Sequence, residues 1–219
     1  MFPKPFLLDP EKTRLLVIDV QNDFCHERGA FAQMGVPMGP IQAMVPRLDA
    51  LIEGSRRAGV PVIFVQTEHG QWTNSKTWLT RRVADEGRER VYPCAEGSWG
   101  AEFYGVKPTP ADRIVTKHRY SGFVGTDLEI ILRSQGVTHV LATGVTTNVC
   151  VESTARDAFM RDYHAILVED CCAAASPEEH RGALTNMRTY FGEVRNASEV
   201  LAALGQEPLP ALSPQGGSK

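Results

Sequence analysis

The amino-acid sequence predicts an α/β protein whose three-layer, doubly wound (Rossmann-like) sheet has about six mainly parallel strands with helices on both faces. Short continuous apolar runs, such as residues 14–20, indicate strands buried on both faces, as in parallel sheets. Segments with apolar residues at helical spacing follow these runs, so strand and helix alternate along the chain. The 219 residues contain neither an internal repeat nor a linker, which favours a single domain.

The first half of the chain opens with the strand at residues 14–20. Apolar residues recur at helical spacing from residue 40 to 58, and Gly59 ends that helix. Residues 60–66 are the second apolar run, in which Pro61 occupies an early strand position where a missing donor is tolerated. The alternation stops over residues 67–105, which hold all three tryptophans. We expect this segment to be an ordered excursion that lines a pocket and contains some local helix.

The alternation resumes with a strand at residues 113–116. The helix predicted at residues 125–136 has Thr126 as its N-cap and Gly136 as its C-cap. The remaining predicted elements are a strand at 138–143, a helix from Cys150 to about Asp162, a strand at 165–169, a helix that begins at Ser176, a short strand at 193–195 and a helix at 198–204. We expect one domain over residues 1–207 and a flexible tail rich in Pro, Gly and Ser over residues 208–219.

Composition excludes several classes of partner. The net charge is −3, and no basic run indicates nucleic-acid binding. No apolar run reaches the roughly 18 residues that span a bilayer, and the first residues lack the pattern of a signal peptide. The five cysteines are odd in number and form no C-x-x-C pair, which favours reduced thiols. These features predict a soluble, cytoplasmic protein without nucleic-acid or membrane partners.

One cysteine stands at a tight turn between a predicted strand and a predicted helix. Cys150 follows the strand at residues 138–143 and precedes a segment with apolar residues at helical spacing. At a helix N-terminus the dipole and the free backbone N–H groups lower the pKa of a thiol and can bind an oxyanion. The alternative is a buried, inert cysteine, which is the commoner environment of a lone thiol.

Two further reactive side chains occur at strand ends. Asp19 lies at the end of the first predicted strand and Lys117 directly follows the third. Since parallel strands end at one rim, we expect both side chains to lie near Cys150 and to support nucleophilic catalysis. Each has an ordinary alternative, a turn residue for Asp19 and a solvated lysine for Lys117. However, Asp19 interrupts an apolar run and therefore needs a partner.

Three segments that contain these residues resemble the signatures of isochorismatase-like cysteine hydrolases. The segments are Val-Ile-Asp-Val-Gln-Asn-Asp-Phe at 17–24, Lys-His-Arg-Tyr-Ser-Gly-Phe at 117–123 and Gly-Val-Thr-Thr-Asn-Val-Cys at 144–150. The resemblance extends from about residue 15 to 193, in the order that the family has. It implies a catalytic triad of Cys150, Asp19 and Lys117, and a cis peptide bond between Val145 and Thr146. The N–H groups of Thr146 and Cys150 would then form the oxyanion hole.

The resemblance also guides the expectation about metals. True isochorismatases lack the cysteine, whereas nicotinamidases of the family bind a metal through an Asp-x-His pair and further histidines. Here the corresponding stretch has only His69 beside Glu68, which is a weak ligand set. We predict no catalytic metal and no cofactor. The family further suggests a homo-dimer or homo-tetramer.

Within the family, the motifs most resemble the members that cleave carbamoyl and ureido groups, namely ureidoacrylate amidohydrolase, N-carbamoyl amidases, and biuret and triuret hydrolases. A ureide is flat and polar, so a pocket for it needs matching hydrogen-bond partners and flat walls. The candidate substrate-binding residues are Asn22, Phe24, Gln66, Trp72, Asn74, Trp78, Tyr120, Asn148 and Tyr190. Each of them is equally compatible with ordinary packing, and Tyr120, three residues after Lys117, is the strongest candidate.

Three functions therefore stay open from the sequence. The first is a cysteine amidohydrolase for a small ureide, and the second is a nicotinamidase-like amidase for a simple amide. The third is a redox or non-catalytic nucleotide-binding protein, although no Gly-x-Gly-x-x-Gly follows the first strand. Neighbouring Cys171 and Cys172 suggest burial rather than redox chemistry. Ammonia release from a panel of ureides, with and without Cys150→Ser, separates the three.

Overall fold

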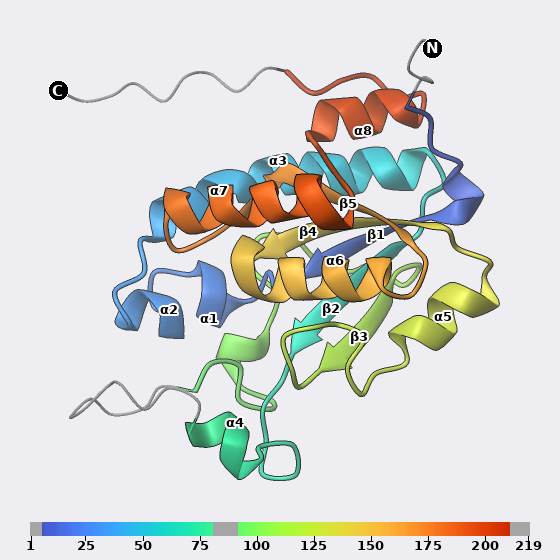
Figure 1. Ribbon diagram of the computed structural model, residues 1–219. Coiled ribbons are helices and arrows are strands. Elements are labelled where there is room, and N and C mark those ends of the chain that lie inside the picture. Colours follow the sequence, from blue (N-terminus) through green and yellow to red (C-terminus); the bar gives the residue numbers. More distant parts are fainter. Residues whose placement is uncertain (1–5, 81–91, 211–219) are drawn as a thin grey trace, which may run out of the picture.

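The computed structural model describes residues 6–80 and 92–210 and contains a six-stranded sheet (Figure 1). The strand order is β3-β2-β1-β4-β5-β6, and every neighbouring pair is parallel. The strands are β1 Thr13–Ile18, β2 Val62–Thr67, β3 Arg113–Lys117, β4 His139–Val145, β5 His164–Ala173 and β6 Glu193–Arg195. The doubly wound parallel sheet predicted from the sequence is confirmed.

Alternate residues of the central strands face two different helical layers. Leu15 and Val17 of β1 pack in a core with α3 Met38–Arg57 and α8 Ala197–Ala203. Leu16 and Ile18 pack in a second core, on the other face of the sheet. The helices of that face are α5 Leu128–Ser134, α6 Glu152–Phe159 and α7 Pro177–Asn186. Both faces of β1 are therefore covered, which explains its continuous apolar run.

Some predicted boundaries differ from the structure. The strand predicted to end at residue 169 continues as β5 to Ala173, because the charges that interrupt its apolar run are paired: Glu169 with Arg188 and Asp170 with Arg47. In α5 the N-cap is Asp127 and not Thr126, whose hydroxyl accepts a hydrogen bond from the N–H of Leu128 at 3.2 Å. Gly136 lies just beyond the C-cap of that helix, with a φ of 61°.

Short helices stand at the C-terminal edge of the sheet and had no clear sequence signal. Runs of four or five residues are too short to show helical periodicity. They comprise α1 Asn22–Cys25, α2 Ala30–Gln33 and α4 Lys76–Thr80. Two 3-10 turns of three residues are shorter still: Trp99–Ala101, and Pro10–Lys12, which directly precedes β1 at the opposite edge of the sheet. A π-helical turn, Thr147–Val151, precedes α6, and a second one, Met187–Phe191, follows α7. Cys150 therefore lies in a π-helical turn and not at the first turn of an α-helix.

The described part of the C-terminal segment is hydrogen-bonded to two helices, and the flexibility expected of residues 208–219 stays a prediction. The carbonyl of Pro210 accepts from Arg47 at 3.0 Å, and the carbonyl of Leu209 accepts from Ser198 at 3.1 Å. Residues 208–210 are thus held against α3 and α8, whereas the rest of the predicted tail lies outside the described residues. Over residues 6–80 and 92–210, no helix combines the length and apolarity needed to cross a bilayer.

The strand order reverses direction between β1 and β4, which places a ligand crevice at their C-terminal ends. Gly144 lets these two strands approach closely. A Cβ atom at this position would lie 2.0 Å from the carbonyl oxygen of Ile18, and its φ of 109° disfavours any other residue. The geometry of the crevice therefore depends on this glycine.

Gly144→Ala should lower the free energy of unfolding by about 3 kcal/mol or more, because the added methyl group collides with the β1 backbone. The matched control is Gly182→Ala in α7, where a Cβ meets nothing within 4 Å. That change should raise the free energy of unfolding by up to about 1 kcal/mol. Urea unfolding followed by circular dichroism measures both, and equal midpoints for the two variants would contradict the close approach.

Candidate active site

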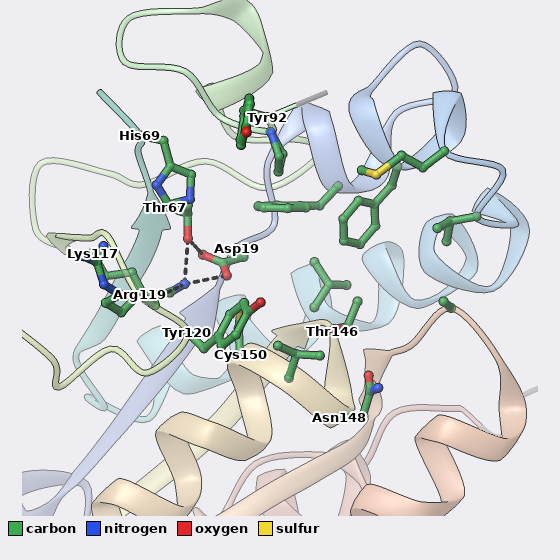
Figure 2. Close-up of a pocket in the computed structure, with 18 of the residues that line it drawn as sticks. Asp19, Thr67, His69, Tyr92, Lys117, Arg119, Tyr120, Thr146, Asn148 and Cys150 are labelled. Carbon is green, nitrogen blue, oxygen red and sulfur yellow. Dashed lines mark hydrogen bonds and ion pairs between the residues drawn. The ribbon is translucent and has the colours of Figure 1, made fainter. Parts of the chain in front are cut away.

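Three strands deliver an acid, an amine and a thiol to one point at the edge of the sheet (Figure 2). Asp19 directly follows β1, Lys117 is the last residue of β3, and Cys150 follows β4 in the π-helical turn. The Lys117 ammonium donates to Oδ2 of Asp19 at 2.8 Å. Cys150 lines the same cavity as Asp19 and Lys117, and both charges act on the pKa of its thiol. The convergence predicted from the parallel strands is therefore present.

The ion pair is buried and its hydrogen bonds are complete. Asp19 and Lys117 are each 1% exposed. Besides Asp19, the Lys117 ammonium donates to the hydroxyl of Thr67 at 2.6 Å and to the carbonyl of Arg119 at 3.1 Å. Since an ammonium can only donate, the Thr67 hydroxyl must direct its own proton to Oδ1 of Asp19, 2.9 Å away. Thr67 thereby fixes both members of the pair.

Gln21 in turn fixes Thr67. Its side-chain oxygen accepts from the Thr67 N–H at 2.8 Å, and its side-chain nitrogen donates to the Thr67 carbonyl at 2.9 Å. The same nitrogen donates to the carbonyl of Ala101 at 2.7 Å. Neither Gln21 nor Thr67 was predicted from the sequence as a site residue. Both could have been found there, because Thr67 ends a parallel strand and Gln21 lies in the first family motif.

Asp19 has a backbone conformation that is unusual for its type. Its φ is 55°, in the left-handed region that few residues other than glycine adopt, and aspartate is among those that tolerate it. The N–H of Asp19 still donates to the carbonyl of Val65 at 2.8 Å, so the chain turns away from β1 only after this residue. Such conformations cluster at functional sites because the surrounding structure has to impose them.

The charges of the site oppose each other in their effect on the cysteine. Burial raises the pKa of the Cys150 thiol, the neighbouring Asp19 carboxylate raises it further, and the Lys117 ammonium lowers it. The net direction is upward, so the expectation of a lowered pKa at a helix N-terminus is wrong. The reason is that the thiol is surrounded by protein and faces an anion as well as a cation. The thiol thus keeps its proton at rest, next to the carboxylate.

For the pKa of Lys117, the neighbouring charges outweigh burial. Burial opposes its charge, but Asp19 and the thiolate form of Cys150 favour the ammonium, and they hold the pKa above its ordinary value. Lys117 therefore remains charged and cannot serve as a proton acceptor near neutral pH.

The other four cysteines are buried and carry free thiols: Cys25, Cys94, Cys171 and Cys172. The expected burial of the neighbouring pair is confirmed. Burial also raises the pKa of each of these thiols. Cys150, which lines a cavity, is therefore the thiol that a small reagent can reach.

The cavity beside Cys150 has a volume of about 380 Å³. Four of the predicted substrate-binding residues line it, namely Phe24, Trp78, Tyr120 and Asn148. The Trp78 and Tyr120 rings lie 4.9 Å apart, with their planes inclined at 56°, so they form an aromatic wall of two tilted faces. The side-chain oxygen of Asn148 is buried and has no hydrogen-bond partner within the described part of the chain. A ligand N–H group could satisfy it.

Thr146 also lines the cavity, next to Cys150 in the turn after β4. The peptide bond between Val145 and Thr146 is cis, as the family resemblance implied. Figure 2 shows Thr146 and Asn148 together on one side of Cys150, with Thr67 and Lys117 on the other.

Two predicted polar contacts, Asn22 and Gln66, lie outside the cavity lining. The side chain of Asn22 donates to the carbonyl of Trp99 at 2.9 Å and is used to join two loops. Gln66 precedes Thr67 in β2, so its side chain leaves the opposite face of the strand and donates to Thr116 at 3.0 Å. Both predictions are corrected by the structure.

Three further predicted contacts also lie outside the lining. Trp72 is 89% exposed, and Tyr190 is 68% exposed in the π-helical turn beyond α7. Asn74 lies in a turn, where its N–H donates to the carbonyl of Gly70 at 3.1 Å. The predicted excursion at residues 67–105 does line the pocket, through Thr67, His69, Trp78, Leu79, Tyr92 and Pro93, apart from residues 81–91, which lie outside the described residues.

The absence of a catalytic metal stays a prediction. His69 lines the cavity, against the Trp78 ring at 5.2 Å. Within residues 6–80 and 92–210, no group of three or more His, Cys, Asp or Glu side chains could hold a metal ion.

Comparison with known proteins shows which family the chain resembles. A family model described as isochorismatase domain matches residues 13–199. Ureidoacrylate amidohydrolase RutB of Methylobacterium radiotolerans is 37% identical, over 98% of this chain and 86% of that protein. A cysteine hydrolase from Pseudomonas syringae pv. phaseolicola has a similar structure, with a TM-score of 0.77 at 28% identity, over 93% of this chain and 99% of that one. Nicotinamidase PncA from Bacillus subtilis has a TM-score of 0.72 at 26% identity, over 84% and 99%.

The two charges beside Cys150 should move its reactivity in opposite directions. Lys117→Ala should shift the alkylation of Cys150 by iodoacetamide to higher pH, because a cation that favours the thiolate is lost. Asp19→Asn should shift it to lower pH, because an anion that disfavours the thiolate is lost. Mass spectrometry of the peptide that contains Cys150 gives both profiles. An unchanged profile in both variants would place the pair outside the site.

Thr67→Val should slow hydrolysis by about 10- to 100-fold, since a hydrogen bond to a charged group is worth about 1.5–3 kcal/mol. Thr67→Ser should restore most of the rate, because the hydroxyl returns to both partners. The control is Thr116→Val in β3, which removes a hydroxyl outside the cavity lining. If valine at residue 67 left turnover and the alkylation profile unaltered, the role given to this hydroxyl would be wrong.

Proposed function

Because this chain belongs to the isochorismatase family, we propose that it is a cysteine-dependent amidohydrolase that cleaves a carbon–nitrogen bond of a small ureide or carbamoyl compound. Its enzyme class is a hydrolase acting on carbon–nitrogen bonds of linear amides, as in the curated relative. The observation that carries the proposal is the cluster of Asp19, Lys117 and Cys150 beside the cavity.

The first half of the reaction forms a covalent intermediate. Asp19 accepts the thiol proton of Cys150, and the thiolate attacks the carbonyl carbon of the substrate. The negative charge that develops on the carbonyl oxygen is stabilised by the N–H groups of Thr146 and Cys150. Asp19 then returns the proton to the leaving nitrogen, which departs as ammonia or an amine. The Lys117 ammonium balances the charge that moves between Asp19 and Cys150 throughout.

The second half hydrolyses the thioester or thiocarbamate. Asp19 takes a proton from a water molecule, and the resulting hydroxide attacks the carbonyl carbon in the same oxyanion hole. The carbon–sulfur bond breaks, and the sulfur receives the proton from Asp19 as the acid or carbamate leaves. One carboxylate therefore serves as acid and base in both halves. The completed hydrogen bonds around Asp19 and Lys117 suit this role, because neither group has to reorient.

The cavity supports a flat, polar substrate. Asn148 offers a buried oxygen to an N–H group, and either the Trp78 or the Tyr120 ring offers a face against which a planar ureide can lie. Compounds of the ureidoacrylate, biuret and triuret type have this shape. A homo-dimer or homo-tetramer is part of the same proposal, and light scattering would measure it.

The second candidate is an amidase for a simple amide such as nicotinamide. It is supported by the structural likeness to a nicotinamidase, which is weaker in identity than the likeness to the ureidoacrylate amidohydrolase. Family membership counts against the redox or nucleotide-binding alternative. Ammonia release from ureidoacrylate, biuret, triuret, N-carbamoyl compounds and nicotinamide, each with and without EDTA, distinguishes these functions and tests the expected absence of a catalytic metal.

Cys150→Ser should reduce turnover of every substrate by at least about 1,000-fold while the fold and substrate binding persist, because a hydroxyl is far less acidic and less nucleophilic than a thiol. Ammonia release measures turnover, and calorimetry measures binding. The control is Cys172→Ser, a buried thiol on β5 that lies outside the cavity lining. Turnover near the wild-type level in Cys150→Ser would refute the nucleophile.

A further inference from the structure

The lining of the cavity is of two chemical kinds. Its polar groups include Asp19 and Lys117 on one side of Cys150 and Asn148 on the other (Figure 2). Its apolar part, which we call the apolar lobe, is defined by six lining residues: Phe24, Phe31, Met34, Val36, Val145 and Val149. The first four come from α1, α2 and the chain just beyond them. Val145 is the last residue of β4, and Val149 directly precedes Cys150 in the π-helical turn.

The apolar lobe is only partly buried by the protein itself. Phe31, Met34 and Val36 are each half-buried, so part of their apolar surface faces the cavity. Phe24 is covered to 7% exposure and meets the ring of Phe31 edge to face, with centroids 4.9 Å apart. Apolar surface that lines a cavity gains free energy when a ligand covers it.

The lobe is a fixed part of the fold. Oδ1 of Asp23 in α1 accepts from the N–H of Ala30 in α2 at 3.0 Å, and its Oδ2 accepts from the N–H of Cys94 at 2.6 Å. Gly29 allows α1 and α2 to touch, because a Cβ there would lie 2.3 Å from the carbonyl oxygen of Asn22. A ligand therefore finds the lobe already ordered, which lowers the cost of binding.

The volume of the cavity exceeds what a compact ureide needs. At about 380 Å³ it falls within the range of roughly 300–1,000 Å³ that holds drug-sized ligands. Biuret, placed at Cys150, has no apolar group to cover the lobe, and ureidoacrylate has only a two-carbon vinyl group that ends in a carboxylate. An apolar substituent large enough to cover the lobe, which these compounds lack, would therefore add to the free energy of binding.

We propose that the apolar lobe receives a large aliphatic or aryl substituent of the substrate, so that this enzyme prefers ureido or carbamoyl compounds with such an N-substituent to biuret and ureidoacrylate. The inference rests on the proposed function, which it narrows to one substrate class. The reacting carbonyl lies at Cys150, the ureide N–H groups face Asn148, and the substituent extends toward Phe31, Met34 and Val36.

An alkylation series tests the lobe without any need for turnover. Cys150 is treated with 2-chloroacetamide and with its N-ethyl, N-butyl and N-benzyl derivatives, and the second-order rate is measured for each. The rate should rise by about three- to fourfold for each methylene that the lobe covers. Met34→Gln should flatten this gradient, measured as each derivative's rate relative to that of unsubstituted chloroacetamide in the same variant.

The matched control is Met160→Gln, the same change at a side chain that is 72% exposed at the end of α6 and outside the lining. It should keep the wild-type gradient. A flat gradient in the wild-type protein, or the same loss of gradient in both variants, would overturn the assignment of the lobe.

A hydrolysis series separates this inference from the proposed function. Biuret and ureidoacrylate are compared with N-carbamoyl derivatives of glycine, leucine and phenylalanine by kcat/KM. A preference of at least about tenfold for the leucine or phenylalanine compound over the glycine compound supports the lobe. Faster hydrolysis of biuret than of every substituted compound would support the proposed function and overturn the inference. An alkylation gradient without hydrolysis of any ureide would overturn the proposed function and leave the preference of the lobe for apolar groups standing.

Discussion

The buried ion pair between Asp19 and Lys117 is the interaction on which the rest of the site depends. Two charges that are each 1% exposed lose nearly all contact with water, and this cost is offset only if every donor and acceptor has a partner. The three donors of Lys117 and both oxygens of Asp19 have one. Thr67 belongs to this set as fully as the two charged residues, because it bonds to both.

The register of the sheet makes these bonds possible. Thr67 and Lys117 are direct neighbours across β2 and β3, and Ile18, just before Asp19, is paired with Val65 of β2 and with Gly144 of β4. A shift by one residue in any of these strands would turn a member of the network to the other face of the sheet. Gln21 secures the register locally by binding both backbone groups of Thr67.

The same network explains how one site can hold a reactive thiol without leaving it ionised at rest. The charges of Asp19 and Lys117 compensate each other, so burial decides the direction and the thiol keeps its proton. The base for that proton is already in place and oriented. The strain at Asp19 and the close approach at Gly144 bring the acid and the cysteine turn to adjacent ends of β1 and β4.

The sequence by itself determined the strands and the three reactive residues. A strand buried on both faces must be apolar, so a polar residue at or just beyond its end can be recognised in the sequence. Only the tertiary structure decided which residues form hydrogen bonds with Asp19 and Lys117. Gln66 and Thr67 are adjacent in sequence, yet only Thr67 faces the site, since successive side chains of a strand point to opposite faces. The direction in which the pKa of Cys150 shifts likewise depends on burial and on two charges, one beyond β1 and one at the end of β3, which no local pattern records. The apolar lobe is assembled from segments more than a hundred residues apart along the chain, and their meeting depends on the strand order rather than on any motif.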